Sequence, residues 1–417
     1  MVFFMGNFMT CRSIIRGSST LLAFVLAWAS ALTAQTRPLP YNPVTAEYSN
    51  VLDRIIFISA NPNQLHIFDP VNNSDSAVNL PKPPLSLSVS LDGMYAAVGH
   101  DALISYVNLQ TAALEKTLAS SSTVTSLVLG NDYVYILTYQ SGTQWVQIST
   151  GATGSYGVYN GTAGRLHPSG TALYTSDNGL SVDQLEDLDV STGPVTGANA
   201  GPYFGDYPVC GGVWFSPDGS RVYVGCAMAY QANPQDATLS ANSSAPVLDT
   251  KADGLYWTPF AGTSQIRSLT ESATLGRIAV IPPNQGSITP PVKDNQVLLY
   301  DSAYIEPAGV FQLPNFEING KSYPAHGQQV FYNQASTALY VVVQAEPSSP
   351  LPNPFAVEIF PGGNPPACAP TFSAARSTLA ASGTVATVGI KAPGTCIYQA
   401  SSTVKLDSAR LRRLWLG

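Results

Sequence analysis

The sequence predicts an all-β chain: a seven-bladed β-propeller followed by a short, incomplete immunoglobulin-like β module. Two observations predict the propeller. Charged residues make up only 11% of the 417 positions, whereas glycine (34), proline (32) and tyrosine (21) are plentiful, a composition that favours short strands joined by turns. A unit of strand, tight turn, strand, loop and strand also recurs, at the roughly 35 to 50 residues typical of propeller blades.

The tight turns mark the repeating unit, because they are rich in the Asp, Asn, Ser and Gly residues that such turns prefer. The opening unit supplies two strands, Arg54–Ser59 and Gln64–Asp69, and seven units are expected between Ala46 and Pro361. The later turns lie at Ser90–Gly93, Gly130–Asp132, His167–Gly170 and Ser216–Gly219, with weaker versions at Leu275-Gly276 and Asn333-Gln334.

Each later turn is followed by a second strand and, beyond a loop, by a third. The expected second strands are Met94–Val98, Tyr133–Thr138, Ala172–Thr175, Arg221–Val224, Arg277–Ile281 and Ala338–Val343. The expected third strands are Leu103–Leu109, Gln144–Ser149, Gln184–Val190, Gly254–Phe260, Gln296–Tyr300 and Phe355–Phe360. No fourth strand follows Phe360, so an N-terminal strand is expected to close the last blade. A β-sandwich is the alternative, but the recurrence favours a ring that buries both faces of every sheet.

The N-terminus has the pattern of an export signal. Arg12 and Arg16 precede an apolar run, Leu21–Trp28, and small residues follow up to Ala31 and Ala34. A membrane anchor is the alternative, but the run is shorter than the roughly 20 residues of a spanning helix. The expected domains are therefore a signal peptide at 1–34, a propeller at 35–361, and a linker with a partial module at 362–417.

Four cysteines remain after the signal segment, an even number that suggests two disulfides in an exported chain. Cys210 and Cys226 are each eight residues from Asp218 in the Ser216–Gly219 turn. An antiparallel hairpin centred on that turn would bring them within bonding distance. Cys368 and Cys396 are the second expected pair.

The stretch Phe215–Val224 (FSPDGSRVYV) resembles the repeats of YVTN/lactonase-like propellers of bacterial surface proteins, and Leu87–Gly93 with Ala96–Val98 is similar. This resemblance implies architecture rather than activity. Beyond a proline-rich linker, Leu379–Val388 and Pro393–Ser401 resemble the first half of a BACON domain, an immunoglobulin-like module attached to extracellular carbohydrate-active proteins. The later strands of that family have no counterpart here, since the chain ends in a basic tail.

Motifs for catalysis are missing from the sequence. It contains no Gly-x-Ser-x-Gly, His-Glu-x-x-His or phosphate-binding loop, and we expect no cofactor and no metal. Of the four histidines, His100 and His326 are expected on one face of the propeller, while His167 lies in a turn on the opposite face. His66 begins a third strand. A hydrogen-bonded structural role is the simpler interpretation of each.

Loop length gives the functional prediction. The connections between first and second strands are short, whereas the longer connections should all emerge on one face, where binding residues usually lie. Aromatic side chains there suit stacking on sugar rings or anchoring a protein partner, although they also suit packing of the loops themselves. The candidate ligand-binding residues are Tyr203, Phe204, Asp206, Tyr207, Tyr230, Phe316, Tyr323, His326, His100 and Asp101.

These features predict a secreted, periplasmic or cell-surface binding module that is monomeric and takes an extracellular glycan or a surface protein as ligand. The net charge of −7 argues against nucleic acid as a partner. One alternative is a lactonase-like or glycan-cleaving hydrolase that uses the central channel, and clustered acids and histidines would favour it. The other is a purely structural module of the cell envelope.

Overall fold

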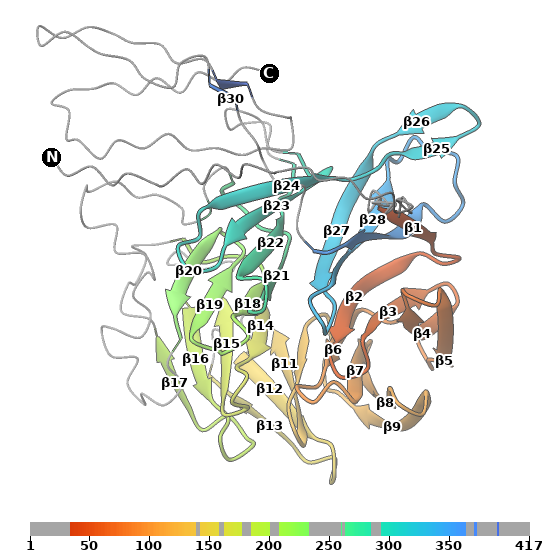
Figure 1. Ribbon diagram of the computed structural model, residues 1–417. Coiled ribbons are helices and arrows are strands. Elements are labelled where there is room, and N and C mark those ends of the chain that lie inside the picture. Colours follow the sequence, from red (N-terminus) through yellow and green to blue (C-terminus); the bar gives the residue numbers. More distant parts are fainter. Residues whose placement is uncertain are drawn as a thin grey trace, which may run out of the picture. The chain divides into compact units, whose positions relative to one another are not determined.

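The computed structural model describes residues 34–138, 142–157, 162–176, 185–200, 208–232, 260, 263–284, 293–363, 371–372 and 390–391 (Figure 1). The chain divides into two units, Met1–Leu32 and Thr33–Gly417, and the first lies outside the described residues. The export signal therefore stays a prediction, as does the terminal module. Within the described residues, no helix has the length and apolar character needed to cross a membrane.

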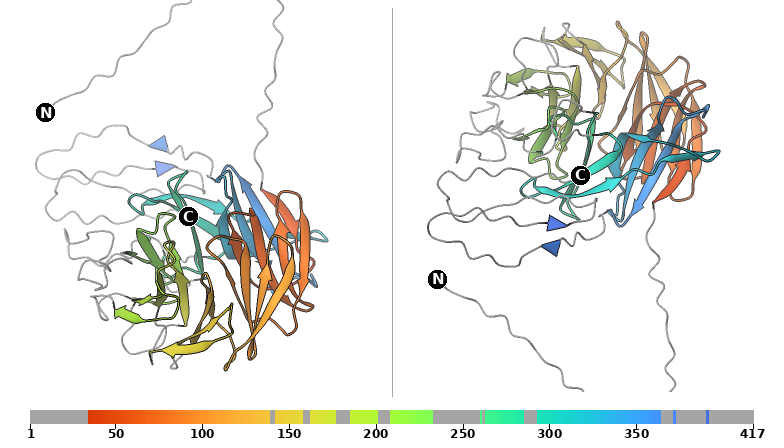
Figure 2. Two further views of the ribbon diagram at one scale, coloured as in Figure 1. Left: turned by 90° about the horizontal axis from the view of Figure 1, so that it is seen from below. Right: turned by 90° about the horizontal axis from the view of Figure 1, so that it is seen from above.

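The described strands form seven consecutive blades, which confirms the predicted propeller; Figure 2 shows them from two further sides. Blades 1 to 3 are β2 (Pro43–Ser49), β3 (Arg54–Ala60), β4 (Asn63–Asp69) and β5 (Ser74–Asn79); β6 (Ser86–Val89), β7 (Tyr95–His100), β8 (Leu103–Asn108) and β9 (Ala113–Ala119); and β10 (Leu127–Leu129), β11 (Tyr133–Thr138), β12 (Gly142–Gln147) and β13 (Thr153–Tyr156).

Blades 4 to 6 follow the same order from the ring axis outward. They are β14 (Ala163–Leu166), β15 (Ala172–Ser176), β16 (Leu185–Asp189) and β17 (Gly197–Ala200); β18 (Val213–Phe215), β19 (Arg221–Val224) and β20 (Met228–Gln231); and β21 (Ser268–Ser272), β22 (Arg277–Ile281), β23 (Gln296–Asp301) and β24 (Pro307–Gln312).

Blade 7 combines the two ends of the propeller. It consists of β27 (Ala325–Tyr332), β28 (Ala338–Ala345), β29 (Phe355–Pro361) and the N-terminal β1 (Gln35–Pro38). Strand β1 pairs antiparallel with β29, and the Thr36 hydroxyl donates to a Glu358 carboxylate oxygen at 2.8 Å. Figure 1 shows β1, at the red end of the colour scale, in the sheet of blue strands. The predicted closure by an N-terminal strand is therefore confirmed.

Two short pairs lie outside the blades. Strands β25 (Phe316–Ile318) and β26 (Lys321–Tyr323) form a hairpin between blades 6 and 7, which projects beyond β27 and β28 in Figure 1. Strands β30 (Thr371–Phe372) and β31 (Ile390–Lys391) pair with each other in the C-terminal part.

The sequence predicted three strands per unit, and the structure adds an outer fourth strand to most blades. These outer strands lack the buried alternation that reveals a strand in sequence: in β9, only Leu118 is buried. In blade 5 the predicted third strand, Gly254–Phe260, lies outside the described residues except for Phe260, which is not in a strand. The strand that follows β19 is β20, which begins after a tight turn ending at Ala227, where φ is +58°.

Each seam between neighbouring blades holds its own apolar core in the described part of the chain. The seam between blades 1 and 2 contains Ile56 and Val98, for example, and the seam between blades 7 and 1 contains Phe57 and Val342, all of them fully buried. Because the last blade packs on the first, each of the seven described blades has a neighbour on both faces. This arrangement distinguishes the ring from a two-sheet sandwich.

The innermost strands present an unpaired backbone edge to the ring axis, and side chains of the preceding blade accept from it. The Val89 amide donates to Glu47 of blade 1 at 2.9 Å, and the Leu129 amide donates to the Ser88 hydroxyl of blade 2 at 3.0 Å. Buried backbone donors need such partners. These bonds therefore fix the register of one blade on the next.

An ion pair crosses the axis of the ring. Arg165 in β14 and Glu47 in β2 are joined at 3.2 Å between Nη2 and Oε1, although blades 1 and 4 are not neighbours. Both residues lie close to the strand ends that lead into the short turns 50–53 and 167–171. The pair therefore bridges the axis near the rim that carries these turns.

The connections divide between two rims. Turns between first and second strands, and between third and fourth strands, have three to seven residues and form what we call the trimmed rim. The other connections form the loop-rich rim. Every connection longer than seven residues between described blade strands belongs to it, including 282–295, 346–354 and 313–324, which contains the β25–β26 hairpin. The long connections between described strands therefore lie at one end of the ring, as the sequence predicted.

Turns of the trimmed rim are bonded to the preceding blade. The Ser49 hydroxyl donates to the Gly93 carbonyl at 2.6 Å, and Nε2 of His167 donates to the Gly219 carbonyl at 2.9 Å. Nδ1 of His167 accepts from the Ser169 amide at 3.0 Å, so both ring nitrogens have structural partners. His167 lies on the trimmed rim, away from the long loops, as its position in the sequence predicted.

Replacing Gly219 by Ala is expected to lower the free energy of unfolding by about 2–4 kcal/mol, because a strained backbone and a clash add together. Gly219 has φ +74°, and a Cβ there would lie 2.6 Å from Nε2 of His167. Gly151→Ala is the matched control, since Gly151 also has φ +74° but nothing lies within 4 Å of its Cβ position. Urea unfolding of both variants makes the comparison; equal losses would contradict the role of the His167 contact.

Candidate functional site

The predicted ligand-binding residues differ in whether the structure describes them and in how buried they are. Tyr203, Phe204, Asp206 and Tyr207 lie outside the described residues, so their role stays a prediction. Phe316 and Tyr323 lie opposite each other in the β25–β26 hairpin of the loop-rich rim, and both are half-buried. The hairpin therefore offers part of two aromatic rings to the surroundings.

His100 and Tyr230 are core residues rather than surface residues, which corrects their assignment to an exposed site. His100 is fully buried, with Nδ1 3.1 Å from the Pro83 carbonyl and Nε2 2.9 Å from the Ser105 hydroxyl. Burial lowers the pKa of His100 and favours its neutral form. Tyr230 is 2% exposed, and its hydroxyl donates to the Pro208 carbonyl at 3.3 Å. Neither ring presents a face to a ligand.

Asp101 occupies the exposed turn after His100. Its carboxylate accepts from the Thr123 hydroxyl at 2.7 Å, and its carbonyl accepts from Lys82 at 2.6 Å. The connection is only Asp101 and Ala102, shorter than the long loop that the sequence suggested at this point. His100 and Asp101 belong to blade 2 and His326 to blade 7, and each histidine has its own set of partners.

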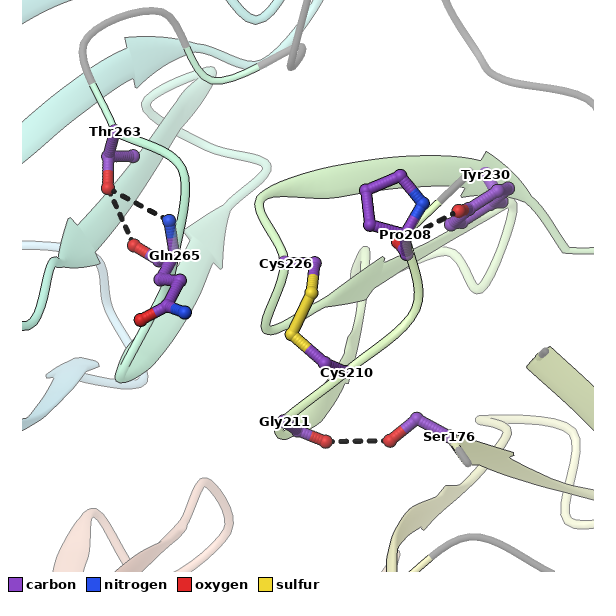
Figure 3. Close-up of a disulfide and its surroundings, with 8 residues drawn as sticks. All are labelled: Ser176, Pro208, Cys210, Gly211, Cys226, Tyr230, Thr263 and Gln265. Carbon is purple, nitrogen blue, oxygen red and sulfur yellow. Dashed lines mark hydrogen bonds between the residues drawn. A yellow bond between two sulfur atoms is a disulfide. The ribbon is translucent and has the colours of Figure 1, made fainter. Parts of the chain in front are cut away.

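The disulfide Cys210–Cys226 is present, as predicted, with 5.2 Å between the Cα atoms (Figure 3). It ties the segment before β18 to the turn between β19 and β20. The Gly225 amide donates to the Gly212 carbonyl at 3.0 Å beside it, and the Ser176 hydroxyl of blade 4 donates to the Gly211 carbonyl at 2.7 Å. The bridge thereby fastens the end of the 201–212 connection to the loop-rich rim. Cys368 and Cys396 lie outside the described residues.

Removing the disulfide in the double variant Cys210→Ala/Cys226→Ala is expected to lower the free energy of unfolding by about 3 kcal/mol, since it closes a loop with a sequence separation of 16. Urea unfolding with and without dithiothreitol measures the effect. The reductant should destabilise the original chain by at least as much. A double variant as stable as the original chain would show that this bridge does not hold the blade.

The described residues of the loop-rich rim contain one cluster of ionisable groups around a histidine, at blades 6 and 7. His326 is the second residue of β27; its Nδ1 is 2.8 Å from Asp294 and its Nε2 is 2.5 Å from Glu346. Asp294 also pairs with Arg267 at 3.3 Å. These four residues come from four different segments, so the cluster joins the 232–267, 282–295 and 346–354 connections to the start of blade 7.

Charge and burial decide what this cluster does. Burial alone would lower the pKa of His326, but the hydrogen bonds and charges of Asp294 and Glu346 outweigh it and raise that pKa. When protonated, the ring donates through both nitrogens, and Arg267 and His326 balance the two carboxylates. A histidine with both nitrogens occupied has no lone pair left to act as a general base on a ligand. The cluster is therefore an anchor that presents His326 and Glu346 at the surface.

Sequence reasoning missed the two acidic partners of His326. Asp294 is 32 positions away and Glu346 is 20 positions away, and nothing in the local pattern joins them. The backbone places them together: the Gly327 amide donates to the Asp294 carbonyl at 2.7 Å, and the Glu346 amide donates to the Pro324 carbonyl at 2.9 Å.

A second constellation, in blade 1, has the order of a hydrolase triad but not its accessibility. Ser59 Oγ is 3.0 Å from Nε2 of His66, whose Nδ1 is 2.7 Å from Asp75. Ser59 is fully buried, its hydroxyl donates to the Pro62 carbonyl at 2.7 Å, and the Tyr41 ring stacks on His66 at 3.6 Å. A nucleophile must reach its substrate, so we assign these residues to the packing of blade 1.

His326→Gln is expected to lower stability near neutral pH and to lose this effect as the pH rises. A raised folded-state pKa gives stability that is fully present below the unfolded value of about 6.5 and is lost as the pH rises through the folded value. Urea unfolding of both proteins from about pH 6 to 9 measures the difference. If the stability difference between His326→Gln and the original chain grew with pH, the ion pairs would not be its source. The control is His167→Gln, because no acidic side chain contacts that ring.

Comparisons with known proteins support the fold of the chain but identify no family. No family model matches the chain, and no curated protein matches it. Among solved structures, 1173 chains are similar, so the fold alone does not select a function. One of them is the β-propeller domain of Cps50 (Swd1) from Myceliophteria thermophila, with a TM-score of 0.54 and 10% identity over 79% of this chain and 99% of that chain.

Proposed function

We propose that this protein is an exported binding module, secreted, periplasmic or held at the cell surface, that takes its ligand on the loop-rich rim and performs no catalysis. The expected ligand is an extracellular glycan or a surface protein. The observation that carries the proposal is the asymmetry of the rims, because all the long connections between described strands gather at one of them. Binding surfaces are commonly built from such loops on a rigid scaffold.

The described part of this surface lies at blades 6 and 7. Tyr323 directly precedes Pro324, whose carbonyl accepts from the Glu346 amide at 2.9 Å. Phe316 pairs with Tyr323 across the hairpin and packs in part against the core between blades 6 and 7. Aromatic rings next to polar and charged groups suit both sugar stacking and protein contacts. The anchor around His326 holds these groups in place, which lowers the entropy lost on binding.

The proposal includes two likenesses taken from the sequence: to YVTN/lactonase-like repeats, and to a partial BACON module after residue 361. The geometry of the Ser216–Gly219 turn supports the first. Ser216 Oγ donates to Asp218 at 2.6 Å and accepts from the Arg221 amide at 2.9 Å. The hydrolase alternative is less well supported, because His326 has both nitrogens engaged and Ser59 is buried.

Tyr323→Ala is expected to weaken ligand binding about tenfold or more, since a tyrosine anchor commonly contributes about 2 kcal/mol. The full chain is screened on a glycan array and against extracellular surface proteins, and the binder found is titrated by calorimetry. Tyr304→Ala is the matched control, because Tyr304 is 69% exposed but lies on the trimmed rim. The double variant Tyr203→Ala/Tyr207→Ala tests the 201–212 connection between β17 and β18 in the same way.

The proposal fails if Tyr304→Ala weakens binding while Tyr323→Ala and the Tyr203/Tyr207 variant do not, since the ligand would then use the trimmed rim. It fails equally if lactones or glycans incubated with the chain are cleaved and His326→Gln stops the cleavage.

A further inference from the structure

A hollow of about 280 Å³ lies between blades 2 and 3 and opens near the loop-rich rim. On one side it is lined by Ser120 and Ser121, in the connection from β9 to β10. On the other side it is lined by residues of β11, β12 and β13 in blade 3: Ile136, Gln144, Trp145, Val146, Thr153, Gly154 and Ser155. Its volume is just below the range of about 300–1,000 Å³ for drug-sized ligand pockets, and suits a single sugar ring.

The pairing of the strands determines which blade 3 residues face the hollow. Gln144 in β12 pairs with Ile136 in β11 and with Ser155 in β13, so the three form a row on one face of the sheet. Val146 and its partner Thr153 lie two residues further along on the same face. The row places an amide and two hydroxyls above the side chains of Ile136 and Val146, which belong to the apolar core of this seam.

The Gln144 amide is held by hydrogen bonds to its oxygen, while its nitrogen remains available as a donor. Its Oε1 accepts from the Ser121 hydroxyl at 3.1 Å and from the Ser122 hydroxyl at 3.3 Å. Within the described residues, neither Nε2 of Gln144 nor the Ser155 hydroxyl has a protein partner. The two N–H groups of the Gln144 amide and the Ser155 hydroxyl are therefore available to a ligand in the hollow. The side chains of Ile136 and Val146 form the apolar part of its lining.

The lining of the hollow contains no acidic or basic side chain. A charged ligand would find no counter-ion there, whereas a neutral ligand rich in hydroxyl groups would find donors, acceptors and an apolar surface for its C–H face. We propose that this hollow is a binding site for a neutral saccharide. The site goes beyond the function proposed above, because it lies in a different part of the ring from Tyr323 and His326.

The test is a titration of the full chain with neutral gluco-, galacto-, manno- and xylo-oligosaccharides, with sialylated and sulfated oligosaccharides as charged comparators. Gln144→Leu removes the donors, and Ser155→Phe fills the hollow from an exposed position. Each is expected to weaken binding of a neutral oligosaccharide about tenfold. Gln64→Leu is the control, since Gln64 occupies a similar place in blade 1 but donates to Asn79 at 2.9 Å.

Loss of binding in both hollow variants, with binding kept in Gln64→Leu and in Tyr323→Ala, supports the site. Unchanged affinity in Gln144→Leu and Ser155→Phe overturns it, as does binding of charged oligosaccharides alone or of none in the panel. A neutral oligosaccharide whose binding depends on Tyr323 but not on Gln144 overturns the hollow and leaves the proposed rim function standing.

Discussion

Closure of the ring through the pairing of β1 with β29 is the constraint on which the rest of this structure depends. Without it, β29 would be an open sheet edge, and the outer side of blade 7 would lose the Thr36 bond to Glu358. The seam between blades 7 and 1 holds the fully buried Phe57 and Val342. A ring that opened there would expose this core to water, so the first strand of the propeller secures the last blade.

Ring closure also explains why the connections differ between the rims. Turns of the trimmed rim are bonded to the preceding blade, as Gly219 is to His167, and a longer turn would break that bond. On the loop-rich rim, connections have room to lengthen, and their ends are secured by other means: the Cys210–Cys226 bridge in one place and the His326 ion pairs in another. Sequence variation is tolerated where the scaffold does not need the loop.

The sequence predicted the repeating architecture because its signals are local. The Ser216–Gly219 turn forms its own side-chain bonds within a few residues, and the apolar runs of inner strands are visible directly. Outer strands such as β9 are exposed at the edge of the sheet and carry no such signal. The cluster of His326, Asp294 and Glu346 could not be predicted, because its members meet only when two loops and a strand are folded together.

Burial separates the polar groups that hold the fold from those that remain available to a ligand. Ser59 and His66 resemble catalytic residues in sequence order and distance, yet their hydrogen bonds are used within blade 1 and both side chains are buried. Polar groups that fold the chain are satisfied internally, since leaving them unpaired in the interior would be costly. The binding capacity that we propose therefore resides where a donor is fixed in position but has no partner among the described residues, as with the amide nitrogen of Gln144.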